Sequence, residues 1–222
     1  MHVLKAEDFD VVEARETVRT LEQGGVVCFP TDTAYGLGVD PFNDSAVERL
    51  FNVKGQSESK PVLLLVDSVE MARSVTEPSP SFETVAAAFW PGPITLVTMA
   101  NQTIPDRITA STGTVGLRWP RMPLAIELIG LFGRPLTATS ANRSNQPGAR
   151  SVADAMDQLG EGVDLYIDGG RLEGMPVSTV LDLTQSPPVL LREGPVSHKE
   201  LTGFFEEGLA RPSSSDADTT PR

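Results

Sequence analysis

The feature that most constrains this chain is an apolar run that ends in a polar, glycine-containing segment. Residues 26–29 (VVCF) are typical of a buried strand, and residues 30–38 (PTDTAYGLG) follow them directly. Open α/β sheets bind their ligands at the carboxyl ends of strands, and glycines let the backbone turn sharply or approach a bound group. Asp32 and Tyr35 can hold such a loop rigid. Taken alone, the segment is either a well-capped turn or a ligand site.

Predicted helices alternate with predicted strands through most of the chain. The predicted helices span residues 8–23, 45–52, 68–74, 82–89, 122–132, 151–159 and 197–207. The predicted strands span residues 26–29, 62–66, 94–99, 114–119, 136–139, 165–168, 179–183 and 189–192. The last two strands are joined through Pro187-Pro188, a connection too short for a parallel crossover. We therefore expect an α/β fold with a mixed sheet.

Polar capping residues predict where several of these helices begin. Ser45 with Glu48, and Ser197 with Glu200, fit the capping-box pattern, in which a serine and a glutamate three residues later satisfy each other's backbone amides. Ser81 fits a single N-cap. We expect each helix to begin directly after its serine.

Length and composition predict one compact unit. A chain of 222 residues that is 40% hydrophobic can bury a sizeable core. We expect one domain over residues 1–207 and a disordered polar tail over residues 208–222, which is of low complexity from Pro212. No apolar run approaches the roughly 20 residues of a membrane span, and the N-terminus lacks a signal-peptide pattern. We expect a cytoplasmic protein.

Charge and rare residues limit the possible chemistry. The net charge of −12 repels nucleic acid and anionic membranes on average, so an anion site must be local. Cys28 lies inside the first predicted strand and is expected to be a core residue. His2 and His198 are the only histidines, which excludes His-rich metal sites and disfavours histidine acid/base catalysis. Chemistry must rest on Lys, Arg, Ser, Thr and Asn.

Familiar catalytic signatures are absent from the sequence. It contains no G-x-x-x-x-G-K-[ST], H-E-x-x-H or G-x-S-x-G pattern, and Pro41 interrupts the dinucleotide fingerprint that Gly36-x-Gly38 would begin. Polar and basic residues instead recur at predicted strand ends and in the adjoining loops. They are Thr31, Thr33, Lys54, Lys60, Arg118, Ser140, Asn142, Ser178, Thr179 and Arg192. A pocket formed by them suits a ligand with phosphate and carboxylate groups, because Arg binds both bidentately.

Arg118 stands out because it ends an otherwise apolar strand. A buried arginine requires a partner. The partner is either a local carboxylate, in a structural salt bridge, or a ligand. From spacing alone, the chain is an anion-binding α/β protein.

A series of short motifs runs along the chain. They are PTDTAYGLG at 30–38, Lys54-Gly55 followed by Lys60-Pro61, WPGP at 90–93, VGLR at 115–118, TSAN at 139–142, and STV at 178–180 with LREG at 191–194. In this order, over about residues 8–205, they resemble the L-threonylcarbamoyladenylate synthases, the YrdC-like family, in its short single-domain form. The resemblance implies an open, twisted mixed sheet flanked by helices around a concave, positively lined cavity.

The resemblance also implies an activity. L-Threonine, bicarbonate and ATP would be joined into threonylcarbamoyl-adenylate and pyrophosphate, the first step of threonylcarbamoyladenosine formation at position 37 of ANN-reading tRNAs. Mg²⁺ would accompany ATP, and a downstream threonylcarbamoyl transferase would provide an indirect link to tRNA. The N-carboxythreonine intermediate is a carbamate that decomposes in bulk water, so a shielded pocket suits this reaction.

The resemblance also implies roles for the residues at positions that match the family's motifs. L-Threonine would be bound by Thr31, Arg118, Ser178 and the backbone of Ala138, with Arg118 on its carboxylate. ATP would be contacted by Lys54, Thr114, Ser140, Asn142 and Arg192, with the loop at Gly148 closing over it. The catalytic residues would be Lys54, Ser140 and Asn142, with Lys54 offsetting charge on the departing pyrophosphate. No side chain is assigned as a metal ligand.

Two positions depart from the family's pattern. Gln56 stands where the family usually has arginine, and Leu65 stands where many members have histidine. A neutral amide cannot replace a guanidinium fork, and loss of one transition-state contact lowers a rate by about 10²–10³-fold. The sequence therefore predicts a synthase that is either active or weakened by Gln56.

Two other functions remain open. The first is a catalytically weakened paralogue that binds nucleotide or double-stranded RNA, which Gln56 favours and the charge of −12 disfavours for RNA. The second is a related carbamoyl-transfer enzyme that uses carbamoyl phosphate. We rank it last because the sequence has no separate acyl-phosphatase or metal-binding module. Threonine binding would distinguish a synthase pocket from a generic nucleotide pocket.

Overall fold

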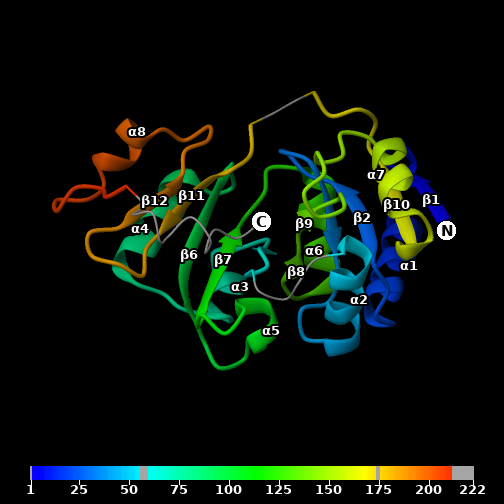
Figure 1. Cartoon of the computed structure of the whole chain (residues 1–222), viewed down its shortest axis with the longest axis horizontal. Helices are drawn as coiled ribbons and strands as arrows, with labels where there is room; N and C mark the ends of the chain where they lie inside the picture. The colour runs from blue at the N-terminus through cyan, green and yellow to red at the C-terminus, as the bar shows by residue number, and fades with distance from the viewer. Residues whose placement is uncertain (1, 56–59, 174–175, 212–222) are drawn as a thin grey trace.

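Two mixed β-sheets with helices packed on them make up the fold (Figure 1). The computed structural model describes residues 2–55, 60–173 and 176–211. Gln56 and residues 212–222 of the predicted tail lie outside these ranges. Within them, no helix is long and apolar enough to cross a membrane.

The first sheet has five strands in the order β1-β10-β2-β3-β9. Their bounds are β1 His2–Lys5, β10 Leu165–Asp168, β2 Val27–Pro30, β3 Tyr35–Gly38 and β9 Thr139–Ser140. β1, β10 and β2 are parallel, and β3 is antiparallel to both β2 and β9. β2 and β3 form a hairpin in which Pro30 pairs with Tyr35. The second half of segment 30–38 is therefore a strand and not the loop expected from its glycines.

The second sheet has the order β12-β11-β6-β7-β4-β8, and β5 pairs with β6. The bounds are β12 Val189–Arg192, β11 Thr179–Asp182, β6 Ile94–Ala100, β7 Thr114–Arg118, β4 Leu64–Leu65, β8 Leu136–Thr137 and β5 Thr76–Glu77. β11 is antiparallel to β12 and parallel to β6, and β4 is parallel to β7 and antiparallel to β8. The predicted mixed sheet and the antiparallel return of the last two strands are confirmed.

One predicted strand, residues 136–139, is divided between the two sheets. β8 pairs with β4 in the second sheet, and β9 pairs with β3 in the first. Ala138 lies between them, and its amide donates a hydrogen bond to the Leu63 carbonyl at 2.9 Å. The sequence does not reveal this change of sheet because residues 136–139 are buried throughout, in both halves of the segment. The crossing ties the sheets together at Ala138.

The helices pack on these sheets. Their bounds are α1 Val11–Glu22, α2 Asp44–Lys54, α3 Val69–Arg73, α4 Pro80–Phe89, α5 Asp106–Thr109, α6 Pro123–Phe132, α7 Val152–Leu159 and α8 His198–Thr202, with 3₁₀ turns η1 Ala6–Asp8 and η2 Gly160–Gly162. α1 and α6 pack on β2, α7 packs on β10, and α4 packs on β6. One hydrophobic cluster joins side chains of both sheets, among them Cys28, Leu64 and Leu96, and a second cluster includes Phe29 and Leu65. Burial raises the pKa of the Cys28 thiol, in line with a core role.

Two helix starts differ from the prediction. Asn43 caps α2, because its side chain accepts from the Ala46 amide at 3.2 Å, while the Ser45 hydroxyl donates to Asn43 at 2.7 Å. Ser79 caps α4, two residues before the predicted Ser81. An asparagine or serine two residues upstream also satisfies free amides of the first turn, so the pattern alone cannot select between them. The capping box of the last helix is confirmed.

The end of the described chain pairs with β12. The Ala210 amide donates to the Pro188 carbonyl, and the Ala210 carbonyl accepts from the Leu190 amide, both at 2.9 Å. Residues 208–211 of the predicted tail are therefore held against the second sheet.

Candidate active site

A cavity of about 230 Å³ lies between the β2–β3 hairpin and β9 of the first sheet and the ends of strands in the second. The lining residues are Thr31, Thr33, Ala34, Tyr35, Gly36, Leu63, Arg118, Ala138, Thr139, Ser140, Val177, Ser178 and Arg192. Pockets for drug-sized ligands typically measure about 300–1,000 Å³. The smaller volume suits a ligand of amino-acid size.

The hairpin loop is held in shape by Thr31. Its hydroxyl donates to the Ala34 carbonyl at 2.7 Å and accepts from the amides of Thr33 and Ala34, each at 3.3 Å. The single hydroxyl hydrogen of Thr31 is thus used within the loop. Thr31 therefore contributes the shape of the cavity wall, and its oxygen is already engaged by two amides.

Tyr35 fastens the hairpin to the segment that follows β10. Its hydroxyl donates to the Gly170 carbonyl at 2.7 Å and accepts from the Gly169 amide at 2.9 Å. Burial raises the pKa of Tyr35 to about 12. The phenol is consequently neutral at physiological pH and serves as a fixed link.

Gly36 leaves room at the cavity wall. A Cβ atom added there would lie 3.7 Å from the Thr139 carbonyl oxygen and 3.8 Å from the Ala138 Cβ, which are ordinary contacts. At Gly38, in the same strand, an added Cβ would lie 2.8 Å from a ring carbon of Phe29. Gly38 is therefore required by packing, whereas Gly36 is a position where a methyl group fits the fold and fills the cavity.

Arg118 is the most buried charge in the lining, with 4% of its side chain exposed. β7 ends at this residue, and its guanidinium reaches the hairpin loop of the other sheet. Nη2 donates to the Asp32 carboxylate at 2.9 Å, and Nη1 donates to the Thr33 hydroxyl at 3.0 Å. Burial lowers the pKa of Arg118, and the Asp32 charge opposes that shift. The structural salt bridge considered for Arg118 is therefore present.

That salt bridge does not use all of the guanidinium. Nε of Arg118 is buried and has no hydrogen-bond partner among the described residues. A buried donor without a partner costs about 1–3 kcal/mol. An oxygen atom brought within hydrogen-bond distance of Nε would remove that cost.

Arg192 reaches the cavity from β12 and is anchored to Ser178. Its Nε donates to the Ser178 carbonyl at 2.9 Å, and its Nη2 donates to the Ser178 hydroxyl at 3.2 Å. The Ser178 hydroxyl also pairs with the Thr95 hydroxyl at 3.0 Å. The second sheet thus brings two guanidinium groups to the same cavity.

Lys54 lies outside the cavity lining and binds the backbone of the segment that contains Ser140. It is buried at the end of α2, and its ammonium donates to the carbonyl oxygens of Ser140 and Asn142. The Asn142 side-chain amide donates to the carbonyls of Arg143 and Gln146, both at 2.7 Å. Its Oδ1 is buried without a partner among the described residues.

The residues expected to bind threonine all line the cavity. They are Thr31, Arg118, Ala138 and Ser178. The Ala138 amide already donates to Leu63, which restricts the contacts that this backbone can offer. Ser140 and Arg192, from the expected ATP set, also line the cavity, while Lys54 and Asn142 adjoin it through Ser140.

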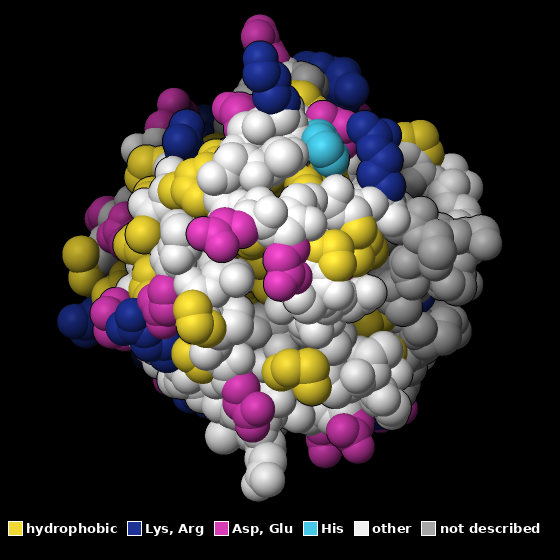
Figure 2. Space-filling model, turned by 90° about the vertical axis from the view of Figure 1, so that its left-hand side faces the viewer, with side chains coloured by type: hydrophobic (Ala, Val, Ile, Leu, Met, Phe, Trp, Pro, Cys, Tyr) yellow, Lys and Arg dark blue, Asp and Glu magenta, His cyan; other side chains and the backbone are white. Residues whose placement is uncertain are grey.

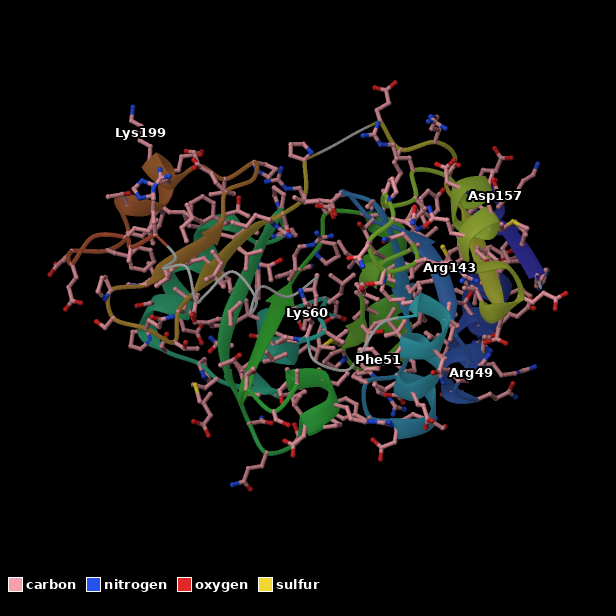
Figure 3. The ribbon with its side chains drawn as sticks, in the orientation of Figure 1. Arg49, Phe51, Lys60, Arg143, Asp157 and Lys199 are labelled. Atoms are coloured by element: carbon pink, nitrogen blue, oxygen red, sulfur yellow. The ribbon has the colours of Figure 1, made fainter. Side chains whose placement is uncertain are left out.

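Two residues of the expected ATP set lie elsewhere. Thr114 begins β7, at the opposite end of the strand from Arg118, and its hydroxyl pairs with that of Thr112 at 2.9 Å. Gly148 lines a separate hollow beside α7, together with Arg150 and Asp154. The loop after β9 is tied to α7, since Arg143 Nε donates to the Gln158 carbonyl at 2.7 Å (Figure 3). The structure does not bring Thr114 and Gly148 to the cavity.

Lys60, which the sequence grouped with the candidate pocket residues, lies between the two groups of strands in Figure 3 but is not a lining residue. Other features of the site were not apparent in the sequence. Leu63 and Val177 line the cavity, yet no pattern distinguishes them from other apolar residues. The pairing of Asp32 with Arg118 joins positions 86 apart in the sequence. The one available signal was the need of a buried arginine for a carboxylate.

Comparison with known proteins adds three findings. The family model Sua5_yciO_yrdC, described as "Telomere recombination", matches residues 19–194. The threonylcarbamoyl-AMP synthase of Pyrococcus abyssi is 37% identical over 194 residues, which cover 87% of this chain and 57% of that protein. The putative threonylcarbamoyl-AMP synthase of Mycobacterium leprae is 41% identical over 182 residues, covering 81% of this chain and 82% of that protein.

Solved structures agree with these sequence relationships. The P. abyssi Sua5 protein, solved in complex with L-threonine, superposes with a TM-score of 0.92 at 32% identity, over 100% of this chain and 67% of that one. YciO of E. coli superposes with a TM-score of 0.79 at 26% identity, over 87% of this chain and 95% of that one. The expected fold, an α/β architecture of mixed sheets flanked by helices, is therefore confirmed.

Proposed function

This chain belongs to the Sua5/YciO/YrdC family, and on that premise we propose that it forms threonylcarbamoyl-AMP and pyrophosphate from L-threonine, bicarbonate and ATP. In this proposal a separate transferase passes the threonylcarbamoyl group to position 37 of tRNA in the cytoplasm. The chain spans 57% of the P. abyssi relative's length, so the rest of that protein does not enter the proposal.

The observation that supports the proposal best is the buried Arg118, which lines a small cavity together with the hydroxyl groups of Thr31, Thr33 and Ser178. Its Nε has no hydrogen-bond partner among the described residues. A guanidinium binds a carboxylate by two parallel hydrogen bonds, which suits the carboxylate of an amino acid. Threonine bound in this way would keep its amino group for the reaction.

The proposed chemistry has two bond-forming steps. The amino nitrogen of threonine attacks the carbon of bicarbonate, and loss of water leaves a carbamate. A carbamate oxygen then attacks the α-phosphorus of ATP, and the bond to the β-phosphate breaks to release pyrophosphate. A cavity that shields the carbamate from bulk water would also hold the reacting atoms together.

The surrounding residues would support these steps in different ways. Arg192, at the end of β12, places positive charge where phosphate oxygens would bind. Asn142 offers the unpartnered Oδ1 to a donor of the ligand. Lys54 keeps Ser140 and Asn142 in place, because its ammonium binds both of their carbonyl oxygens.

Mg²⁺ enters the proposal only as an ion bound to the phosphates of ATP. Among the described residues, no group of three or more His, Cys, Asp or Glu side chains could hold a metal ion. The cavity offers hydroxyl and guanidinium groups, whereas Mg²⁺ prefers carboxylates and water. The residues therefore do not form a resident metal site, and no step is assigned to one.

The proposal is tested by incubating the protein with ATP, bicarbonate and labelled L-threonine. We expect equal amounts of adenylate product and pyrophosphate, and neither when bicarbonate is removed. Because Gln56 replaces the arginine that the family usually carries, we expect Gln56→Arg to raise the rate, by up to about 10²-fold. Failure of both proteins to form the adenylate would contradict the synthase.

The second candidate is a non-catalytic protein that binds nucleotide or double-stranded RNA, and Gln56 is the observation that favours it. In Figure 2, acidic side chains are spread over one face and basic ones gather toward its edges, so this face has no continuous basic surface. RNA binding held by phosphate contacts weakens steeply with salt. A salt-dependent shift of double-stranded RNA at micromolar protein would favour this candidate, and ATP binding without RNA affinity would remove its RNA form.

A further inference from the structure

Asp32 is the acidic partner of the arginine that the proposed function places on the threonine carboxylate. Its Oδ1 lies 2.9 Å from Nη2 of Arg118, and 16% of its side chain is exposed. The neighbours Thr31 and Thr33 line the cavity, but Asp32 does not. Asp32 therefore acts on a ligand without lining its site, through its contact with Arg118 and through its charge.

The hydrogen bonds of Arg118 divide the guanidinium into two edges. The terminal nitrogens Nη1 and Nη2 are held by Thr33 and Asp32, two consecutive residues of the hairpin loop. Nε is buried without a partner among the described residues. A guanidinium has five N–H donors, so this arrangement leaves Nε–H and a second N–H of a terminal nitrogen for a carboxylate. The loop thus selects the edge on which a ligand can bind.

The same contact affects the charge that a ligand meets. Asp32 and Arg118 form a neutral pair in a region with little solvent. A ligand carboxylate at Arg118 lies close to a second negative charge, and like charges a few ångströms apart repel by an amount that depends on the local dielectric. The pair therefore stabilises the ligand-free protein and weakens carboxylate binding.

We infer that Asp32 is a positioning residue that orients Arg118 toward the cavity and, by competing with the ligand carboxylate for its charge, sets the affinity for L-threonine. This inference rests on the proposed function. It separates two properties of Asp32: the oxygen that orients Arg118 and the charge that competes with the ligand.

Two substitutions separate these properties. Asp32→Asn keeps a side-chain oxygen that can accept from Arg118 but removes the charge, whereas Asp32→Ala removes both. Asp157→Asn is the matched control, because Asp157 is exposed on α7, away from the cavity lining (Figure 3). Each protein is titrated with L-threonine by calorimetry, and its melting temperature is measured without ligand.

We expect Asp32→Asn to bind L-threonine about 3–10-fold more tightly than the unsubstituted protein, because one repulsive charge is removed. Its melting temperature falls, because Arg118 is then buried without a counter-ion. Asp32→Ala binds about tenfold more weakly than Asp32→Asn because Arg118 loses an orienting contact, and Asp157→Asn binds as the unsubstituted protein does. A purely structural role would lower the melting temperature and leave affinity unchanged.

Unchanged or weaker threonine binding by Asp32→Asn would overturn the inference. Failure of the unsubstituted protein to bind threonine would instead contradict the proposed function. If the unsubstituted protein does not bind threonine, acetate serves as the probe of the Arg118 guanidinium. Tighter acetate binding by Asp32→Asn supports the role of Asp32, and equal or absent binding in both proteins overturns it.

Discussion

The two walls of the cavity differ in chemistry and in how they are held. The hairpin wall contains neutral groups whose hydrogen bonds are mostly internal, as the hydroxyls of Thr31 and Tyr35 show. The wall from the second sheet carries the guanidiniums of Arg118 and Arg192. The first wall sets the shape of the cavity, and the second supplies charge. Thr31, which matches the family's motif, can therefore shape the cavity without its hydroxyl contacting the ligand.

The largest effect is expected from changing the charged wall at Arg118. Arg118→Lys keeps the positive charge but loses the fork that binds Asp32, Thr33 and a carboxylate together. We expect threonine affinity to fall by about 10²-fold, in line with the loss of one charge-assisted hydrogen bond of about 1.5–3 kcal/mol. Calorimetric titration measures the effect.

The matched control for this change is Arg121→Lys. Arg121 is exposed and donates to the Pro91 carbonyl, away from the cavity lining. The affinity of the Arg121→Lys protein for threonine should equal that of the unsubstituted protein. Equal affinities of Arg118→Lys and Arg121→Lys would show that the second sheet does not supply the binding charge.

A smaller effect is expected from changing the shape of the hairpin wall. Gly36→Ala adds a methyl group at ordinary contact distances, so the fold is retained while the cavity becomes smaller. We expect about tenfold weaker threonine binding with little change in the free energy of unfolding, since shape alone is altered. Urea unfolding and threonine titration give the two quantities.

Gly38→Ala, in the same strand, is expected to destabilise the fold, in contrast to Gly36→Ala. Its Cβ would lie 2.8 Å from Phe29 and 3.0 Å from Leu136, so we expect a loss of about 1–3 kcal/mol in stability. If Gly36→Ala destabilises the protein as much as Gly38→Ala, Gly36 is a packing residue and the comparison between the walls fails.

The smallest effect is expected at Thr114. It lies on the strand that carries Arg118, but at the opposite end, and its hydroxyl bonds to Thr112. We expect Thr114→Ala to change the Michaelis constant for ATP by less than about twofold, because surface changes away from such features are usually small. A larger increase in the Michaelis constant would show that the ATP site extends along the whole of β7.

The sequence predicts much of the fold because local signals are strong where strands and helices alternate. The strand before Thr31, the strand that ends at Arg118 and the last antiparallel pair all form where apolar runs predict them. The division of residues 136–139 between two sheets was not predictable. Hydrogen-bond partners decide it, and both sheets bury the segment equally well.

The site is predictable to a similar degree. Arg118, Ser140, Ser178 and Arg192 meet at one cavity because strand ends converge there, as their positions after or before apolar runs suggest. The sequence could not identify Asp32 as the partner of Arg118, since that contact depends on how the two sheets face each other. The resemblance assigned Thr114 and Arg118 to one site, although the predicted strand 114–119 already places them at opposite ends.

The most direct test of the central claim is a crystal structure of the protein with L-threonine. The proposed site predicts threonine between the hairpin and the second sheet, with its carboxylate on Nε of Arg118 and its amino group pointing away from that side chain. Threonine bound outside this cavity, or bound with its amino group at Arg118, would contradict the account.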